Sequence, residues 1–308
     1  MKINFWWDNL EKDRKIRIPS KVDAFAYITR DGYISFQLKL EKNIEKKTYD
    51  NLRFQNIEII SCGKELYFVL KTSEFKDVFY YLCLDLLKNL EGQPFNKYTN
   101  IIYKVFDYWK KLFKKKQNNI SEIIQMGLFA ELNFLCNDKL KNLSLSENIS
   151  SWRGFSGDIQ DFLYENTSVE VKSKLSSKAN EVTISSVNQL EHIKENLFLV
   201  CYSLDKNENG KTIETLVEEI LSLIRKESLG LETAFIKGLL EYGYNCFDDY
   251  DNLVSYLVDG IETFEVLEGF PRITNKDIPT GVVKVEYKIN LNVLIPYEEC
   301  KLKGVKEI

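Results

Sequence analysis

Apolar and polar residues alternate in steps of two over the first part of the chain and then recur at helical spacing. Alternation on both sides of Asp31-Gly32, and again around Cys62-Gly63, predicts two β-hairpins, because Gly at a tight turn readily adopts a positive φ. The spacing that follows is typical of amphipathic helices. We expect helices over residues 75–92, 96–116 and 121–137.

The middle of the chain predicts a short series of strands between two helices. Alternation on both sides of a turn at Glu165-Asn166 predicts a third hairpin, with strands over 160–164 and 168–172. We then expect a strand at 180–186, an amphipathic helix at 186–196 and a buried strand over the apolar run 197–204. From residue 121 onward the predicted order is therefore α-β-β-β-α-β.

The last third predicts helices and then strands. Helices are expected over 212–227, 231–243 and 250–260, strands over 261–274 and 282–297, and a turn over 206–212. The polar residues 117–119 are the candidate domain boundary. The sequence thus predicts an N-terminal β-rich domain with helices over 1–117 and a second domain over 118–308.

Charge gives no global argument for nucleic-acid binding, because the formal net charge of the 308 residues is −4. A local basic groove can still exist on an acidic protein. A lysine cluster lies near the end of the second predicted helix, at Lys110, Lys111, Lys114 and Lys115. We interpret the cluster as a solvated helix end, and the alternative is contact with DNA phosphates. The same alternative applies to Lys174 and Arg272.

Cysteine usage and hydropathy indicate a soluble cytoplasmic protein. The six Cys residues are scattered singly and there is one His, which argues against a structural zinc site. No apolar run approaches the roughly 20 residues of a membrane span, and the N-terminus does not resemble a signal peptide. We therefore expect reduced cysteines and no membrane partner.

The third hairpin carries the candidate chemistry. Side chains alternate along a strand, so Glu170 and Lys172 share one face while Val169 and Val171 share the other. Asp161, at the far end of the first strand of the hairpin, lies near the level of Lys172. The carboxylates of Asp161 and Glu170 and the carbonyl of Val171 could then form half the coordination shell of Mg²⁺. Lys172 would lie beside the attacking water, where it could orient it or stabilise charge on a phosphate.

Glu131 lies in the helix predicted over 121–137, on or beside its apolar stripe. An acid that faces inward is costly unless it is paired or binds a metal. The alternative is a flanking Glu whose carboxylate reaches water.

These residues resemble the PD-(D/E)XK nuclease superfamily, and in particular a bacterial family found near methyltransferase and ATPase genes of phage-defence loci. The resemblance covers about residues 120–297 and rests on Glu131, Gln-Asp-Phe at 160–162, Glu-Val-Lys at 170–172 and Gln189. It implies a mixed α/β (α+β) fold with a restriction-endonuclease-like core. It also implies Asp161 and Glu170 as ligands of Mg²⁺ (or Mn²⁺ in its place), Lys172 as the catalytic lysine, and Glu131 and Gln189 as accessory residues.

The motif departs from the superfamily pattern at its first half. Gln160 stands where the superfamily has Pro, and Asp158 is an alternative first acid. Asp161 fits better because eight residues separate it from Glu170 and because Phe162 follows it, as in the family.

The resemblance implies a Mg²⁺-dependent endonuclease of double-stranded DNA, similar to type II restriction enzymes, that serves phage defence. A homodimer and other defence proteins, such as a methyltransferase or an ATPase, are the implied partners. Two alternatives remain at this point. One is a DNA-binding or assembly subunit with little nuclease activity of its own. The other is a protein-interaction module whose hairpin charges are merely solvated.

Overall fold

The structure is a computed structural model, and it describes residues 5–43, 49, 56–112, 119–136, 143–154, 158–225, 229–299 and 302. Its internal contacts divide the chain into two units, Met1–Lys115 and Lys116–Ile308. Each unit is described by itself below.

The first unit contains a five-stranded antiparallel sheet in the order β1-β2-β3-β5-β4. Its strands are β1 (Lys15–Arg17), β2 (Ala24–Ile28), β3 (Ile34–Lys39), β4 (Ile57–Cys62) and β5 (Glu65–Leu70). The two predicted hairpins are confirmed, with Gly32 and Gly63 at φ +88° and +60° in their turns. Both positions need the left-handed conformation that Gly adopts without steric cost.

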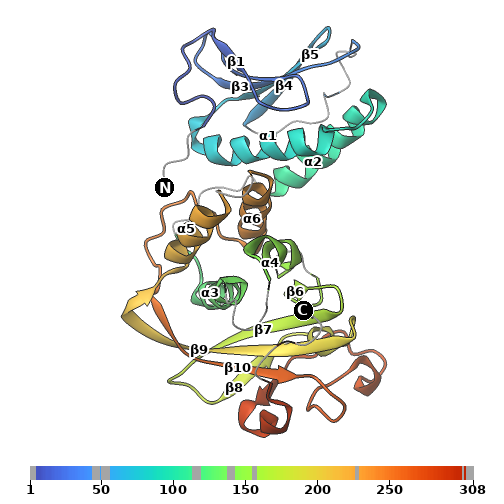
Figure 1. The fold of residues 1–308 in the computed structure, drawn as a ribbon, viewed down its shortest axis with the longest axis vertical. Coiled ribbons are helices and arrows are strands. Elements are labelled where there is room, and N and C mark those ends of the chain that lie inside the picture. Colours follow the sequence, from blue (N-terminus) through green and yellow to red (C-terminus); the bar gives the residue numbers. More distant parts are fainter. Residues whose placement is uncertain are drawn as a thin grey trace. The chain divides into compact units, whose positions relative to one another are not determined.

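Two helices cover one face of this sheet (Figure 1), and both were predicted. They are α1 (Lys76–Leu90) and α2 (Tyr98–Leu112), preceded by the 3₁₀ turns η1 (Ser73–Phe75) and η2 (Phe95–Lys97). Alternate strand residues face the helices, and the rings of Phe68 and Phe106 stack with centroids 4.8 Å apart. Trp109 of α2 donates its indole N–H to Asp85 of α1 over 2.8 Å, which joins the two helices.

The second unit contains a four-stranded sheet in the order β10-β9-β7-β6 and a two-stranded sheet, β11-β8. The strands are β6 (Phe162–Leu163), β7 (Thr167–Leu175), β8 (Glu181–Ile184), β9 (Asn196–Lys211), β10 (Tyr256–Glu265) and β11 (Tyr287–Asn290). β7 and β9 run parallel, whereas β6 and β10 pair antiparallel at the two edges. The predicted hairpin of β6 and β7 is confirmed, with Phe162 opposite Val169.

Helix α3 (Glu122–Cys136) lies against the sheet beside β7 (Figure 1). The rings of Phe134 and Phe162 lie 4.6 Å apart and fix this packing. Three more helices belong to the unit: α4 (Leu145–Ser151), α5 (Ile213–Ile224) and α6 (Leu229–Tyr242). α4 was not predicted, although a capping box between Ser144 and Glu147 opens it.

The helix predicted over 186–196 is wrong. The segment forms only the 3₁₀ turn η3 (Val187–Leu190), followed by irregular backbone that leads into β9. An α-helix needs its carbonyls to accept from amides four residues on. Here the carbonyls of Asn188, Gln189 and Glu191 instead accept from Nε2 of Gln160, over 3.1, 3.2 and 2.9 Å. The second helix of the expected α-β-β-β-α-β order is therefore replaced by a turn.

Two further expectations are wrong in the last third. The helix predicted over 250–260 is absent: residues 250–255 are turn and irregular backbone, and 256–260 begin strand β10. The turn predicted over 206–212 belongs mostly to β9. Leu257 pairs with Asp205 across this ladder, so pairing between strands overrides the helical spacing. Gly210 allows the two strands to approach closely, because a Cβ at this position would lie only 2.9 Å from the Leu257 nitrogen.

The segment predicted as a strand over 282–297 is strand only in β11. After β11 the chain forms the 3₁₀ helix η5 (Leu291–Tyr297). A shorter 3₁₀ turn, η4 (Asn275–Asp277), lies before β11. Leu291 and Leu294 of η5 pack into an apolar cluster with Val182, Leu199 and Phe264. No helix among the described residues is both long and apolar enough to cross a membrane.

Gln125 joins the start of α3 to the segment that precedes β10. Its Nε2 donates to the carbonyls of Ile120 and Asn252, and its Oε1 accepts from the Val254 N–H over 2.8 Å. We predict that Gln125→Leu lowers the free energy of unfolding by about 2–4 kcal/mol, because it leaves backbone groups without partners. Urea denaturation measures this change. The control Ile123→Gln, on a side chain that is 84 % exposed, should stay within about 0.5 kcal/mol of wild type; an equal loss would contradict the prediction.

Candidate active site around Asp161, Glu170 and Lys172

Backbone hydrogen bonds fix Asp161 immediately before β6. Its carbonyl accepts from the N–H groups of Arg153 and Gly154, over 2.6 and 3.1 Å. Its side-chain Oδ2 accepts from the N–H of Val171 over 2.8 Å. β6 begins at Phe162, opposite Val169, so it has no residue opposite Val171. The Asp161 carboxylate accepts the hydrogen bond that a strand neighbour would otherwise accept from the Val171 N–H.

Glu170 and Lys172 lie on the same face of β7, as their spacing predicts. Nζ of Lys172 is 2.6 Å from Oε1 of Glu170, and the two side chains are 17 % and 1 % exposed. Oε2 of Glu170 is buried and has no hydrogen-bond partner among the described residues. A buried carboxylate oxygen without a partner is costly, so this arrangement favours the arrival of a cation or a proton.

The pKa values follow from burial and mutual repulsion. Burial raises the pKa of Glu170 to about 8, the Asp161 charge adds to the rise, and Lys172 opposes it. Burial likewise raises the pKa of Asp161, against the effects of Lys172 and the Val171 N–H. Burial by itself lowers the pKa of Lys172, but the carboxylates of Glu170 and Asp161 outweigh it and the pKa lies above its usual value. Lys172 is therefore a cation at neutral pH.

Glu131 of α3 brings a third carboxyl group to the other side of Asp161. Its Oε2 accepts from the indole N–H of Trp152 over 2.7 Å, and its Oε1 accepts from the Tyr242 hydroxyl over 2.9 Å. Burial first, and the Asp161 charge second, raise its pKa well above the ordinary value. Glu131 is thus an inward-facing, paired acid, which was one of the two interpretations of the sequence.

Two glycines make room for this network. A Cβ at residue 154 would overlap Oε2 of Glu131 and lie 3.0 Å from Oδ1 of Asp161. A Cβ at residue 127, in α3, would lie 2.6 Å from the Tyr242 hydroxyl. Both positions therefore exclude a side chain because carboxyl and phenol groups occupy the space.

The donor set fits a hard divalent cation. Asp161 and Glu170 supply carboxylate oxygens, and the Val171 carbonyl points toward Asp161, since the N–H and C=O of one strand residue face the same neighbour. No group of three or more His, Cys, Asp or Glu residues within the described ranges has the geometry of a metal site. Mg²⁺ suits such a site, because it retains waters and commonly binds only one or two protein carboxylates together with substrate phosphate.

Comparison with protein families matches residues 4–292 to the family described as "Putative PD-(D/E)XK family member, (DUF4420)". The chain belongs to this family. No curated protein and no solved structure matches the chain. Membership in this PD-(D/E)XK family implies a restriction-endonuclease-like core, and members of the superfamily are typically phosphodiesterases that use divalent metals.

The structure separates the two candidates for the first acid of the PD-(D/E)XK motif. Asp161 lies in the cluster with Glu170 and Lys172. Asp158 is exposed and forms an ion pair with Arg153, whose Nε is 3.7 Å from Oδ2 of Asp158. Gln160, in the position of the motif proline, is buried and fixes η3 next to the start of β6.

Gln189 lies in η3 and makes a local contact. Its Oε1 accepts from the backbone N–H of Ser185 over 3.0 Å and from the Ser185 hydroxyl over 3.1 Å. Within the described residues, no hydrogen bond joins its side chain to Asp161, Glu170 or Glu131. Its predicted role as an accessory site residue stays a prediction.

The candidate DNA-contacting residues are divided between the two units. Lys110 and Lys111 lie in the last turn of α2, and Lys111 is 3.8 Å from Asp107. Lys114 and Lys115 lie outside the described residues. Lys174 is half-buried on β7, and Arg272 donates a hydrogen bond to the carbonyl of Leu190. A role in DNA contact stays a prediction for all of them.

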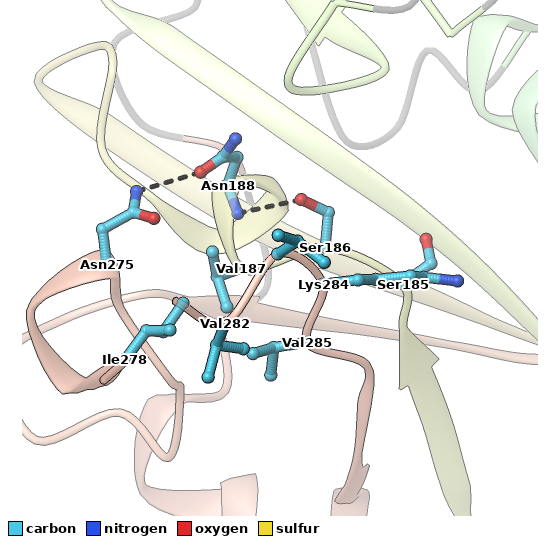
Figure 2. A pocket seen from close by; sticks show the side chains of 10 residues that line it. Ser185, Ser186, Val187, Asn188, Asn275, Ile278, Val282, Lys284 and Val285 are labelled. Carbon is cyan, nitrogen blue, oxygen red and sulfur yellow. Dashed lines mark hydrogen bonds between the residues drawn. The ribbon is translucent and has the colours of Figure 1, made fainter. Parts of the chain in front are cut away.

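A surface cavity of about 200 Å³ lies between η3 and the segment 275–285 (Figure 2). Asn275 donates to Oδ1 of Asn188 over 3.0 Å beside this cavity (Figure 2). The exposed Val283 is among its lining residues. Its lining includes none of the three acids. The cavity is therefore not part of the carboxylate cluster.

Trp152, Gly154 and Tyr242 complete the network but were not identified as site residues from the sequence. Trp152 lies eight positions or more from the hairpin strands and Tyr242 is 111 residues from Glu131. A helix-end Tyr such as Tyr242 gives no local pattern that would assign it to a carboxylate.

Gly154→Ala should destabilise the second unit by about 2–4 kcal/mol, because the added Cβ displaces a carboxyl group that two buried hydrogen bonds hold in place. Chemical denaturation measures this loss. Gly260→Ala is the matched control, since the nearest atom to its Cβ would be 4.0 Å away. Similar stabilities for the two variants would rule out the steric explanation.

The pH dependence of stability should reveal Glu170. In the folded state its pKa is about 8, whereas an unfolded Glu titrates near about 4.3. The folded state therefore binds the extra proton between these values, and stability should fall as the pH rises from about 4.3 to 8. In EDTA, Glu170→Gln should remove this slope and gain up to a few kcal/mol near pH 8, with the gain vanishing toward pH 5. Denaturation at several pH values tests this, with Glu165→Gln, in the exposed turn, as the control.

Proposed function

We propose that the chain is a metal-dependent endonuclease that hydrolyses phosphodiester bonds of double-stranded DNA. One observation carries the proposal: the carboxylates of Asp161 and Glu170 meet beside the buried cation of Lys172, with one Glu170 oxygen left without a partner. Membership in the PD-(D/E)XK family supports it, since that motif uses the same three residue types.

Asp161, Glu170 and the Val171 carbonyl would hold Mg²⁺, and Mn²⁺ could replace it. When bound, the ion supplies a Lewis acid that polarises the phosphate and lowers the pKa of a bound water. Both carboxyl groups must lose their protons to bind the ion, and their pKa values are raised. Metal affinity should therefore increase as the pH rises toward 8.

Lys172 acts in this proposal through its charge. Its pKa lies above the ordinary value, so the ammonium group cannot serve as a base in this state. It can donate hydrogen bonds to a phosphate oxygen and stabilise the charge that develops there. Glu131 is a positioning residue in this proposal, because its carboxyl group and that of Asp161 border the same space at Gly154 and interact electrostatically.

A role in restriction or phage defence is the biological setting that we propose. It rests on the resemblance to the family near methyltransferase and ATPase genes. Those enzymes are the proposed partners, and a homodimer is the proposed assembly, because two active sites are needed to cut both strands symmetrically.

A second candidate is a DNA-binding or assembly subunit with little nuclease activity. The ion pair of Lys172 with Glu170 favours it, because the pair already neutralises one carboxylate without a metal.

Cleavage of long DNA of varied sequence, such as a phage genome, tests the proposal in Mg²⁺ and in Mn²⁺. We expect Asp161→Asn, Glu170→Gln and Lys172→Ala each to lower the cleavage rate at least about 100-fold. Calorimetry with Mn²⁺ alone should show binding that Glu170→Gln abolishes.

The controls are Glu165→Gln and Lys178→Ala, two exposed charges on the same hairpin region, and they should retain the wild-type rate. Cleavage that survives Glu170→Gln or Lys172→Ala excludes this active site. DNA binding in a gel-shift assay, without cleavage in either metal, would instead establish the second candidate.

A further inference from the structure

The face of the first unit's sheet that α1 and α2 leave uncovered carries a second candidate site. Phe36 and Phe68 face the helices, so their neighbours along the strands, Ser35, Gln37 and Tyr67, face the other way. Pairing between strands places Tyr27 beside Ser35 and Tyr67 beside Gln37. These side chains surround a cavity of about 450 Å³. That volume is in the range of small-molecule sites.

The floor of the cavity is polar and buried. Ser35 and Gln37, on the central strand β3, are 0 % and 1 % exposed. Nε2 of Gln37 donates to the Tyr67 hydroxyl over 3.1 Å, and Lys15 is 3.5 Å from its Oε1. The Ser35 hydroxyl has no hydrogen-bond partner among the described residues. A buried polar group without a partner costs about 1–3 kcal/mol, which a ligand group could offset.

Two neighbouring aromatic rings line the cavity. The ring centroids of Tyr27 and Tyr67 lie 6.5 Å apart with the planes at 60°. Their hydroxyls donate to Asp13 over 3.1 Å and to Glu65 over 2.6 Å, which holds both rings in place. The cavity therefore offers fixed ring faces above a floor of amide and hydroxyl groups.

Asp13, on the rim, has a strained backbone. Its φ is +59°, the one positive value among the non-glycine residues of the described ranges. Its carboxylate accepts from the Tyr27 hydroxyl and from Nε of Arg30, over 3.1 and 2.9 Å. Such strain costs about 1 kcal/mol and concentrates at binding sites.

We propose that this cavity binds a nucleobase. A base is a flat ring that can stack on a Tyr, with an edge of amino and carbonyl groups that Gln37, Ser35 and Asp13 can pair. The charges of Lys15, which lines the cavity, and of Arg30, which pairs with Asp13, are balanced by those of Asp13 and Glu65. Recognition of the base therefore outweighs attraction of the phosphate. The proposal does not depend on the nuclease activity, because the site lies in the other unit.

The base can belong to an unpaired nucleotide of a strand or to a free nucleotide. Titration calorimetry of the full chain, in EDTA to prevent cleavage, would use the four ribonucleoside monophosphates, short single-stranded DNA and duplex DNA. Binding of a monophosphate identifies a free-nucleotide site. Binding of single-stranded DNA alone identifies a site for an unpaired base. Binding of none of these ligands by the wild type overturns the proposal, whether or not the chain cuts DNA.

Variants test the cavity itself. Tyr67→Ala should weaken binding at least about tenfold through lost stacking, and Gln37→Leu should do the same through the base edge. Tyr67→Phe keeps the ring and should retain most of the affinity. Tyr33→Ala, an exposed Tyr outside the cavity, is the matched control. Should Tyr67→Ala fail to fold, Gln37→Leu still decides. Wild-type affinity in Gln37→Leu and in any folded Tyr67→Ala overturns the proposal.

Discussion

The buried carboxyl group of Glu131 is the constraint on which the second unit depends. It accepts hydrogen bonds from the Trp152 indole at the end of α4 and from the Tyr242 hydroxyl at the end of α6, which joins both helices to α3. The Glu131 carboxyl group and that of Asp161 border the space that Gly154 leaves open. Without those partners, nothing would offset the free energy of removing the carboxyl group from water. The network also sets the backbone around Gly154, whose N–H donates to the Asp161 carbonyl, so the position of Asp161 follows from it.

The electrostatics of the site are those of a cluster with more carboxyl groups than cations. Three carboxyl groups share a single close lysine, and burial raises the pKa of all three. A proton on Glu170 or a divalent cation reduces the excess negative charge, so protonation and metal binding compete for the same oxygens. This competition links the stability of the fold to the chemistry proposed for it.

The two units differ in what covers the second face of their sheets. In the second unit, α3 covers one face of the four-stranded sheet, and the apolar cluster that includes Leu199, Val182 and Leu294 covers the other. In the first unit, helices cover one face, and the other carries Tyr, Gln and Ser residues around a cavity. A polar sheet face with buried side chains is unusual for a purely structural domain, which is why we assign it a binding role.

The sequence by itself determined the hairpins, the helices α1, α2, α3, α5 and α6, and the shared face of Glu170 and Lys172, since each depends on local periodicity. It did not determine the secondary structure of residues 186–196, because the Gln160 side chain donates hydrogen bonds to carbonyls that would accept from backbone amides in a helix. The first half of strand β10 likewise arose from pairing with β9, against its helical spacing. The partners of Glu131 were decided by tertiary structure alone. Tyr242 is 111 residues away, and only the packing of α6 brings its hydroxyl to a carboxylate that nothing local marks as its partner.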